Sequence, residues 1–149
     1  MADKYDALKL DNQLCFPLYA CAKEVVRRYK PFLDEVDLTY TQYITMMVMW
    51  EHRKMSVKDI GKILFLDSGT LTPVLKTLEK KGFIKRHRSE DDERVLDVLL
   101  TEEGLMLREQ CVDIPAKVGS CINLDMQEAA QLYMILHKMM SGTKDNCPL

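Results

Sequence analysis

The chain has 149 residues, of which 47% are hydrophobic and 30% charged, a composition typical of one soluble globular domain. The first nine residues carry charges of both signs, and no apolar run approaches the roughly 20 residues that span a bilayer. We therefore expect a cytoplasmic protein with no signal peptide and no contact with a membrane. The cysteines are odd in number and widely spaced, which argues against a disulfide scaffold and a structural zinc site. They are Cys15, Cys21, Cys111, Cys121 and Cys147.

Positive charge gathers in one segment although the net charge of the chain is −2. Ten Lys or Arg and three acidic residues lie between Arg53 and Arg88, so this segment carries +7 and the remainder of the chain −9. Such an asymmetry is typical of a module that binds nucleic-acid phosphates. A solvated charged face would give the same pattern, so charge alone leaves both interpretations open.

Apolar periodicity predicts four helices before any strand. The first covers about residues 12–29, with Asp11 or Asn12 as its cap, a strained Pro17 beyond the first turn, and Pro31 at its end. The next three begin at Thr39 or Thr41, at Ser56 and at Ser68, and the last of them stops before Gly82.

A hairpin and two further helices follow. The hairpin pairs residues 83–87 with residues 95–100 around a charged tip. A long helix starts near Glu102 and is expected to kink or break at Pro115, and a last helix covers about residues 125–140. Three short helices followed by a basic hairpin predict a mainly α fold, a winged helix-turn-helix over about residues 39–100 with a two-stranded β wing.

This architecture predicts where DNA would bind. An α-helix fits the major groove, and a basic hairpin reaches the backbone or the minor groove. The recognition helix would begin with small polar residues that permit close approach, and the wing would carry arginines on both sides of the acidic tip. We expect Asp67 or Asp92 to orient Arg94. The predicted DNA-binding residues are Ser68, Gly69, Thr70, Thr72, Lys76, Arg86, Arg88 and Arg94.

Several motifs resemble those of the MarR family of transcriptional regulators, and the N-terminal motifs resemble its OhrR branch of organic-hydroperoxide sensors. The first group is LDSGTLTP at 66–73, RSxxDER at 88–94 and LTExG at 100–104; the second is LDNQLCF at 10–16, LYA at 18–20, YKP at 29–31 and LTYTQY at 38–43. The resemblance implies a single domain over residues 1–149 that forms a homodimer through helices at about 10–30 and 102–141. It also implies a pseudopalindromic double-stranded DNA operator.

The same resemblance implies a redox-sensing repressor in which an organic hydroperoxide oxidises Cys15 and so releases the operator. Cys15 lies in the first turn of a predicted helix, where the helix dipole favours a thiolate. Tyr29 and Tyr40 match tyrosines whose hydroxyls reach the sensing cysteine across the dimer, and Tyr19 matches a neighbour. Cys121 matches the region of a resolving cysteine in some members, with Cys111 as a second candidate, while Pro17 departs from the family pattern.

Three other functions compete with this interpretation. A MarR-type repressor could be released by a small aromatic ligand or an electrophile, with Cys15 incidental. A thiol peroxidase would need a resolving thiol and a reductase, and it would not need the basic segment. A metalloregulator would need a ligand cluster, which the scattered His52, His87 and His137 do not offer. We therefore predict no enzymatic activity, no cofactor and no metal.

Overall fold

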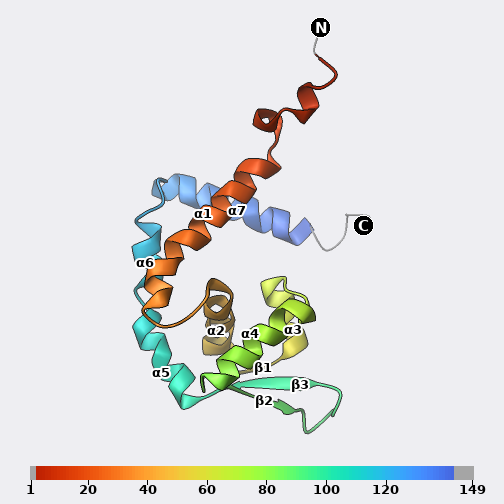
Figure 1. Ribbon diagram of the computed structural model, residues 1–149, viewed down its shortest axis with the longest axis vertical. Coiled ribbons are helices and arrows are strands. Elements are labelled where there is room, and N and C mark those ends of the chain that lie inside the picture. Colours follow the sequence, from red (N-terminus) through yellow and green to blue (C-terminus); the bar gives the residue numbers. More distant parts are fainter. Residues whose placement is uncertain (1–2, 143–149) are drawn as a thin grey trace. The chain divides into compact units, whose positions relative to one another are not determined.

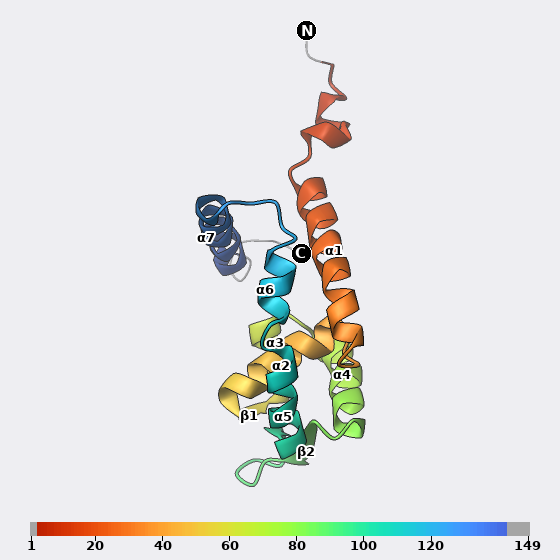
Figure 2. The ribbon, with the colours of Figure 1, turned by 90° about the vertical axis from the view of Figure 1, so that its left-hand side faces the viewer.

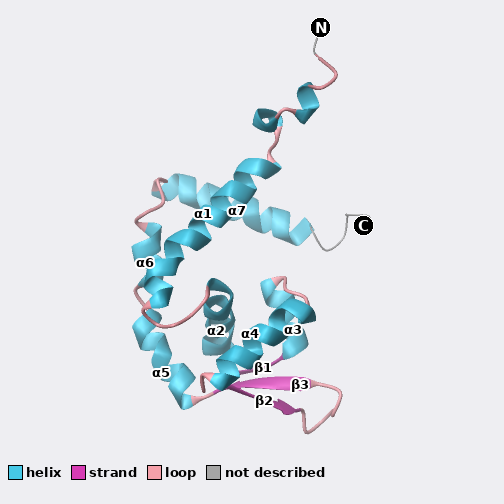
Figure 3. Ribbon diagram, viewed as in Figure 1, coloured by secondary structure: helices cyan, strands magenta, loops and turns pink. Residues whose placement is uncertain are grey.

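The computed structural model describes residues 3–142 and divides the chain into two compact units, Met1–Val118 and Gly119–Leu149. Helices dominate both units, and a small sheet lies in the first (Figures 1 and 3). Among the described residues, no helix combines the length and apolarity needed to cross a membrane. The elements are two 3-10 turns (Asp6–Leu8 and Leu10–Asn12), α1 (Cys15–Asp34), α2 (Tyr40–His52), β1 (Lys54–Ser56), α3 (Val57–Leu64), α4 (Ser68–Lys80), β2 (Ile84–Arg88), β3 (Leu96–Leu100), α5 (Glu102–Cys111), α6 (Ile114–Gly119) and α7 (Met126–Gly142).

Helix α1 differs from the predicted helix at both ends. It begins at Cys15 without a side-chain cap, because residues 10–12 form a turn of their own, so the expected caps Asp11 and Asn12 were wrong. Pro17 is the third residue of α1, where backbone N–H groups have no intrahelical acceptor, so the expected strain at Pro17 was also wrong.

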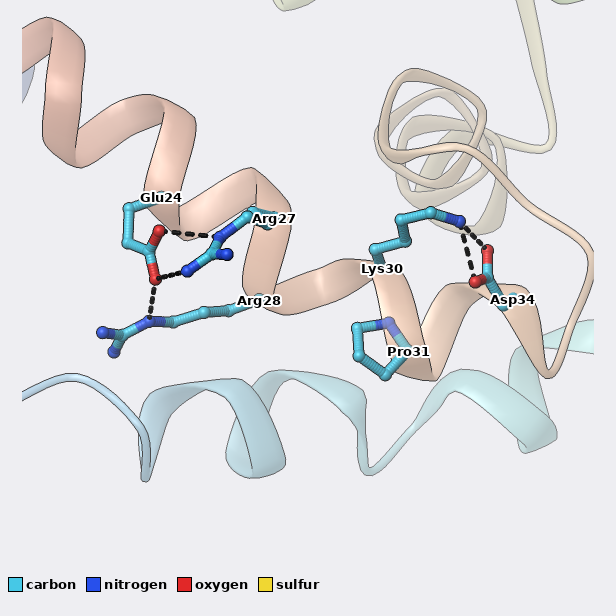
Figure 4. A pocket seen from close by; sticks show the side chains of 6 residues that line it. All are labelled: Glu24, Arg27, Arg28, Lys30, Pro31 and Asp34. Carbon is cyan, nitrogen blue, oxygen red and sulfur yellow. Dashed lines mark hydrogen bonds and ion pairs between the residues drawn. The ribbon is translucent and has the colours of Figure 1, made fainter.

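Pro31 does not end helix α1, in contrast to the prediction. A proline inside a helix removes one backbone hydrogen bond, but this one lies on the exposed face, where water can take the place of the missing donor. Lys30, just before the proline, pairs with Asp34 at 2.8 Å (Figure 4). Leu33, which is 2% exposed, anchors the last turn of α1 in the core.

The next two helices begin at predicted capping residues, and α4 stops before the predicted Gly82. Thr39 and Gln42 form a reciprocal capping box at α2, and the Ser56 hydroxyl accepts from the backbone of Asp59 at α3. Helix α4 is capped by Asp67, and it stops where Gly82 adopts a φ of +81°, with paired backbone bonds that satisfy its last carbonyls.

The sheet has three strands rather than the predicted two. Strand β3 lies in the centre and pairs antiparallel with β2 and with β1, so that Val98 faces both Arg86 and Met55. Strand β1 is only three residues long, which is too short for a period-two pattern to reveal it. The hairpin β2–β3 projects beside the helices as the wing (Figure 3).

The core of the first unit lies where helices α2, α3 and α4 meet the inner face of the sheet. Met46, Met49, Ile60, Leu75 and Val98 are fully buried there. Each such side chain contributes roughly 1.5–3 kcal/mol to stability by leaving water. The core therefore fixes α4, the predicted recognition helix, relative to the wing.

One joint connects the wing, helix α2 and helix α5. The Trp50 indole N–H donates to the carbonyl oxygen of Gly104 at 2.8 Å, and the Thr101 hydroxyl donates to the carbonyl of Gly82 at 2.6 Å while it accepts from the backbone N–H of Gly104. A Cβ atom added at Gly104 would overlap the carbonyl oxygen of Phe83. The joint therefore requires a glycine at the start of α5.

An ion pair ties the wing to helix α4. The Glu79 carboxylate accepts from the Arg86 backbone N–H at 2.8 Å, and from its Nε and Nη2 at 3.0 and 2.7 Å. The two side chains are 35% and 19% exposed. Hydrogen bonds from Arg86 lower the pKa of Glu79 below its ordinary value of 4.5. Arg86 thus orients the first strand of the wing.

The helix predicted from Glu102 onward breaks, as expected, near Pro115. Helix α5 ends at Cys111, and α6 begins at Ile114. Pro115 has no N–H for the carbonyl four residues earlier, which belongs to Cys111, and so α5 ends there. Helix α6 packs back against α1, where the Lys117 ammonium lies over the ring of Phe32 (Figure 2). In the second unit, Asp125 and Glu128 cap α7 reciprocally.

The joint at Gly104 predicts that Gly104→Ala strongly destabilises the protein. The added methyl group must displace the backbone of Phe83, and overpacking of this kind costs about 2–3 kcal/mol. Urea unfolding followed by circular dichroism measures the change. Gly119→Ala is the matched control, because a Cβ there meets nothing within 4 Å. Equal stability of the two variants would contradict the joint.

The Glu79–Arg86 pair predicts a pH dependence. Since the folded state lowers the pKa of Glu79, the pair stabilises the protein at neutral pH and this contribution is lost as the pH falls below 4.5. Glu79→Gln should lower the free energy of unfolding at pH 7, and the difference from the unaltered protein should shrink towards pH 3, in urea unfolding at about pH 3, 5 and 7. Glu90→Gln, on the exposed wing tip, is the control. A difference in unfolding free energy that is the same at all three pH values would show that the ionised Glu79 does not stabilise the protein.

Candidate functional site

The first turn of helix α4 presents small polar residues to solvent. The Asp67 carboxylate accepts from the backbone N–H of Thr70 at 2.8 Å and from its hydroxyl at 3.1 Å, and the backbone bond is the main cause of the lowered pKa of Asp67. Ser68, Gly69 and Thr70 are exposed. This turn therefore has the small, open surface that close approach to a DNA groove requires.

The wing tip is held by its own backbone. The Asp92 carboxylate accepts from the backbone N–H of Arg94 at 2.9 Å, and the Arg88 guanidinium donates to the carbonyl of Glu93 at 3.1 Å. Arg88 and Arg94 are both exposed. Asp92 thus positions the main chain of Arg94, whereas Asp67 binds Thr70. We predicted that one of these carboxylates orients the Arg94 guanidinium, and the single chain does not show that contact.

The basic segment divides into paired and exposed cations. Four of its ten cations form intramolecular ion pairs: Lys54 with Asp97, Lys62 with Asp59, Lys81 with Asp37 and Arg86 with Glu79. Arg86, predicted to contact DNA, is engaged inside the protein. Lys76, Lys80 and Lys85 are exposed on α4 and the wing, and so remain available to phosphate.

Cys15 is the first residue of helix α1, and it is exposed. Leu14 and Phe16 beside it are 79% and 44% exposed. Tyr19, one turn further along, is also exposed and has the ammonium of Lys23 over its ring at 5.1 Å. The sensing turn predicted from the sequence is therefore an open, largely apolar surface on this chain.

Tyr29 and Tyr40 lie together but away from Cys15. Their ring centroids are 5.0 Å apart, and Tyr43 lies against both. Burial raises the pKa of Tyr29 and Tyr40, so both phenols stay protonated and can donate hydrogen bonds. Tyr29 follows Cys15 by 14 positions along α1, which corresponds to a rise of about 21 Å. One chain therefore does not bring these tyrosines to its own Cys15.

The other cysteines have different surroundings. Cys111 is 2% exposed, and burial raises the pKa of its thiol, which weakens it as a nucleophile. Cys121 is exposed between α6 and α7 in the second unit, and Cys21 is exposed on α1. Cys147 lies outside the described residues.

A pocket that the sequence did not reveal opens between α2 and the α5–α6 bend. Its volume is about 290 Å³. Burial, with neighbouring Tyr29, raises the pKa of Tyr43 to about 12, and Tyr43 lines the pocket together with Trp50 and Cys111. Arg108 and Glu51 add charge to an otherwise apolar lining. The signal for this pocket is spread over two helices distant in sequence, so no local motif marks it.

A second hollow lies along α1. It is lined by Glu24, Arg27, Arg28, Lys30, Pro31 and Asp34 (Figure 4). The Glu24 carboxylate binds both Arg27 and Arg28, with distances of 2.9 to 3.2 Å, and this pairing lowers its pKa. Within residues 3–142, no group of His, Cys, Asp or Glu side chains could hold a metal ion.

Comparisons with known proteins place the chain in a family. The model of the transcriptional regulator SarA/Rot family matches residues 27–110. The chain is 45% identical to the organic hydroperoxide resistance transcriptional regulator of Bacillus subtilis over 94% of this chain and 95% of the relative. It is 42% identical to the HTH-type transcriptional regulator SarZ of Staphylococcus aureus, over 92% and 93% of the two chains.

Solved structures agree with these relatives. Reduced AbfR bound to DNA superposes with a TM-score of 0.80 at 31% identity, over 95% of this chain and 97% of AbfR, a protein of Staphylococcus epidermidis. AbfR has also been solved overoxidized on DNA and in a disulfide form. With its mainly helical fold and small antiparallel sheet, the chain belongs to the MarR family of transcriptional regulators, in the branch of the organic hydroperoxide resistance regulators.

Proposed function

We propose that the protein is a redox-sensing transcriptional repressor that binds operator DNA as a homodimer and releases it when an organic hydroperoxide oxidises Cys15. The observation that carries the proposal is the exposed Cys15 at the start of α1, in a chain 45% identical to an organic hydroperoxide resistance regulator. A regulator of this kind acts on the chromosome, so we place it in the cytoplasm, and we assign it no enzymatic turnover.

The proposed DNA contacts lie at the start of α4, where Ser68, Gly69 and Thr70 are exposed and Thr72 is partly buried, and on the wing. Ser68, Gly69, Thr70 and Thr72 would enter the major groove, with Lys76 on the phosphates. Arg88 and Arg94 would reach the backbone or the minor groove from the wing tip. In the complex with operator DNA, Asp67 or Asp92 would orient the Arg94 guanidinium, as the sequence predicts.

A homodimer accounts for the large apolar side chains that α1 and α7 expose. Leu14, just before α1, and Tyr19 on α1 are 79% and 60% exposed. Met126, Tyr133 and Met134 on α7 are 90%, 62% and 71% exposed. Soluble monomers rarely leave so much apolar surface in water. We therefore assign both terminal helices to the dimer interface, which presents two recognition helices to the two halves of a pseudopalindromic operator.

The dimer would also complete the sensor. Since Tyr29 lies about 21 Å along α1 from Cys15 and Tyr40 packs against Tyr29, the hydroxyls that stabilise the thiolate would come from the partner subunit. The thiolate attacks the terminal oxygen of the hydroperoxide, the O–O bond breaks, and the organic alcohol leaves after taking up a proton. The sulfur loses two electrons and becomes a sulfenic acid.

Cys121 is the proposed resolving residue. Its thiolate would attack the Cys15 sulfenic acid of the partner subunit, form an intersubunit disulfide and release water. Exposure of Cys121 supports this role, whereas the buried thiol of Cys111 is a poorer candidate. A small cellular thiol would give a mixed disulfide by the same chemistry.

The pocket between α2 and the α5–α6 bend favours a second candidate function. Its lining of Tyr43, Trp50 and Arg108 would suit a small aromatic ligand. In this alternative the same operator complex is released by a ligand, with Cys15 incidental. A thiol peroxidase is disfavoured, because it gives no role to the exposed cations of α4.

The central prediction concerns Cys15→Ser. This variant should bind an operator, selected from random DNA by the reduced protein, as tightly as the unaltered protein, but cumene hydroperoxide should no longer release it. A serine hydroxyl cannot be oxidised to a sulfenic acid. Gel-shift titration with and without the hydroperoxide measures both properties.

Cys21→Ser is the matched control, since Cys21 is exposed on the same helix, and it should respond normally. Release of the Cys15→Ser variant by the hydroperoxide would end the sensor assignment. Release by small aromatic compounds, but not by hydroperoxide, would favour the ligand-controlled alternative.

A second prediction concerns Cys121→Ser. Non-reducing gel electrophoresis of the hydroperoxide-treated unaltered protein should show a disulfide-linked dimer, because two subunits supply the two sulfurs. The dimer band should vanish in Cys121→Ser and persist in Cys111→Ser. Persistence of the band in Cys121→Ser would remove Cys121 from the mechanism.

A further inference from the structure

Lys81 lies in the basic segment, but its side chain points into the protein. It is 22% exposed, and its ammonium contacts the carbonyl oxygen of Asp37, the Asp37 carboxylate at 3.0 Å and the Gln42 side-chain oxygen at 3.4 Å. An ammonium has three protons, and these three acceptors account for all of them. Lys81 is therefore engaged within the protein and is not part of the surface offered to phosphate.

The acceptors all belong to the turn between α1 and α2 and to the start of α2. Asp37 has a left-handed φ of 52°, which is strained for a residue with a side chain. The Gln42 oxygen also accepts from the backbone N–H of Thr39, so it serves the capping box of α2 and Lys81 at once. This turn leads directly into Tyr40, whose ring packs on Tyr29.

Lys81 is the C-cap residue of the recognition helix α4. Its N–H donates to the carbonyl of Thr77 at 3.0 Å, and the chain reverses at Gly82 immediately afterwards. The lysine thus joins the last turn of α4 through its backbone and the turn of the tyrosine pair through its ammonium. A shift of one end moves the other, because both attachments are made by the same residue.

We propose that Lys81 is a positioning residue that couples the α1–α2 turn, which carries the sensing Tyr40, to the recognition helix α4. The coupling rests on the proposed function for its biological meaning. The mechanical link itself requires neither DNA nor an oxidant.

The first test measures that link by hydrogen–deuterium exchange of the DNA-free dimer. Lys81→Met keeps the length of the side chain and removes the ammonium. Exchange should rise both in residues 36–42 and in residues 77–83, because both ends lose one attachment. Lys80→Met is the matched control; Lys80 is exposed and has no ion pair within residues 3–142, so neither segment should change. A rise at one end alone, or at neither, would overturn the proposal.

The second test uses the salt dependence of operator binding. Loss of a phosphate contact lowers the slope of log affinity against log salt by about 0.9. Lys80→Met should show such a decrease, whereas Lys81→Met should weaken binding about 2- to 30-fold with an unchanged slope, as expected for lost positioning. A lower slope in Lys81→Met would show a phosphate contact and would overturn the proposal.

The third test addresses the coupling. Asp37→Asn tolerates the left-handed backbone but removes the charge, and together with Lys81→Met it forms a double-mutant cycle. The ratio of operator dissociation constants after and before hydroperoxide treatment should fall about threefold or more in Lys81→Met, and Asp37→Asn should change nothing further in that background. An unchanged ratio would overturn the coupling. If the unaltered protein neither binds DNA nor responds to hydroperoxide, the proposed function fails, and the exchange measurement still decides the link.

Discussion

The absence of a side chain at Gly104 is the constraint on which the arrangement of the first unit depends. The backbone of Phe83, at the start of the wing, occupies the space that any Cβ at Gly104 would need. Two hydrogen bonds complete the joint: the Trp50 indole donates to the Gly104 carbonyl, and the Gly104 N–H donates to the Thr101 hydroxyl. Helix α2, the wing and helix α5 therefore meet at one point, and the close backbone contact at Gly104 limits the direction in which α5 leaves.

Ion pairs also fix the position of the recognition helix in the winged helix-turn-helix. Glu79 holds the wing to the C-terminal end of α4 through Arg86, and Lys81, next to that same end, holds it to the turn before α2. Both cations lie in the segment whose positive charge suggests DNA binding, yet each is used to place the recognition helix. The cations left exposed, among them Lys76 and Lys85, are then presented by a helix and a wing in fixed relative positions.

The proposed sensor divides between chains for a geometrical reason. Cys15 begins a 20-residue helix, and Tyr29 lies near its other end beside Tyr40. A straight helix cannot bring its two ends together, so in the proposed sensor a second copy of the chain supplies the two tyrosines. Leu14 and Tyr19, on either side of Cys15 in sequence, are also exposed, so in the proposed dimer the same end of α1 would serve both the sensor and the interface.

The sequence by itself determined the local features of this protein. The capping residues Thr39, Ser56 and Gly82, the recognition helix, the wing and the break near Pro115 all follow from interactions over a few residues, and the structure confirms them. The family was also readable from motifs. Only the tertiary structure decided where α1 begins, that α1 continues beyond Pro31, and that β1 joins the sheet. It also decided which acceptors Arg86 and Lys81 bind. Each depends on a partner distant in sequence, such as the core around Leu33, the edge of β3, or the carboxylates of Glu79 and Asp37. Periodicity and charge describe what a residue can do, and only packing decides which of its possible partners lies within reach.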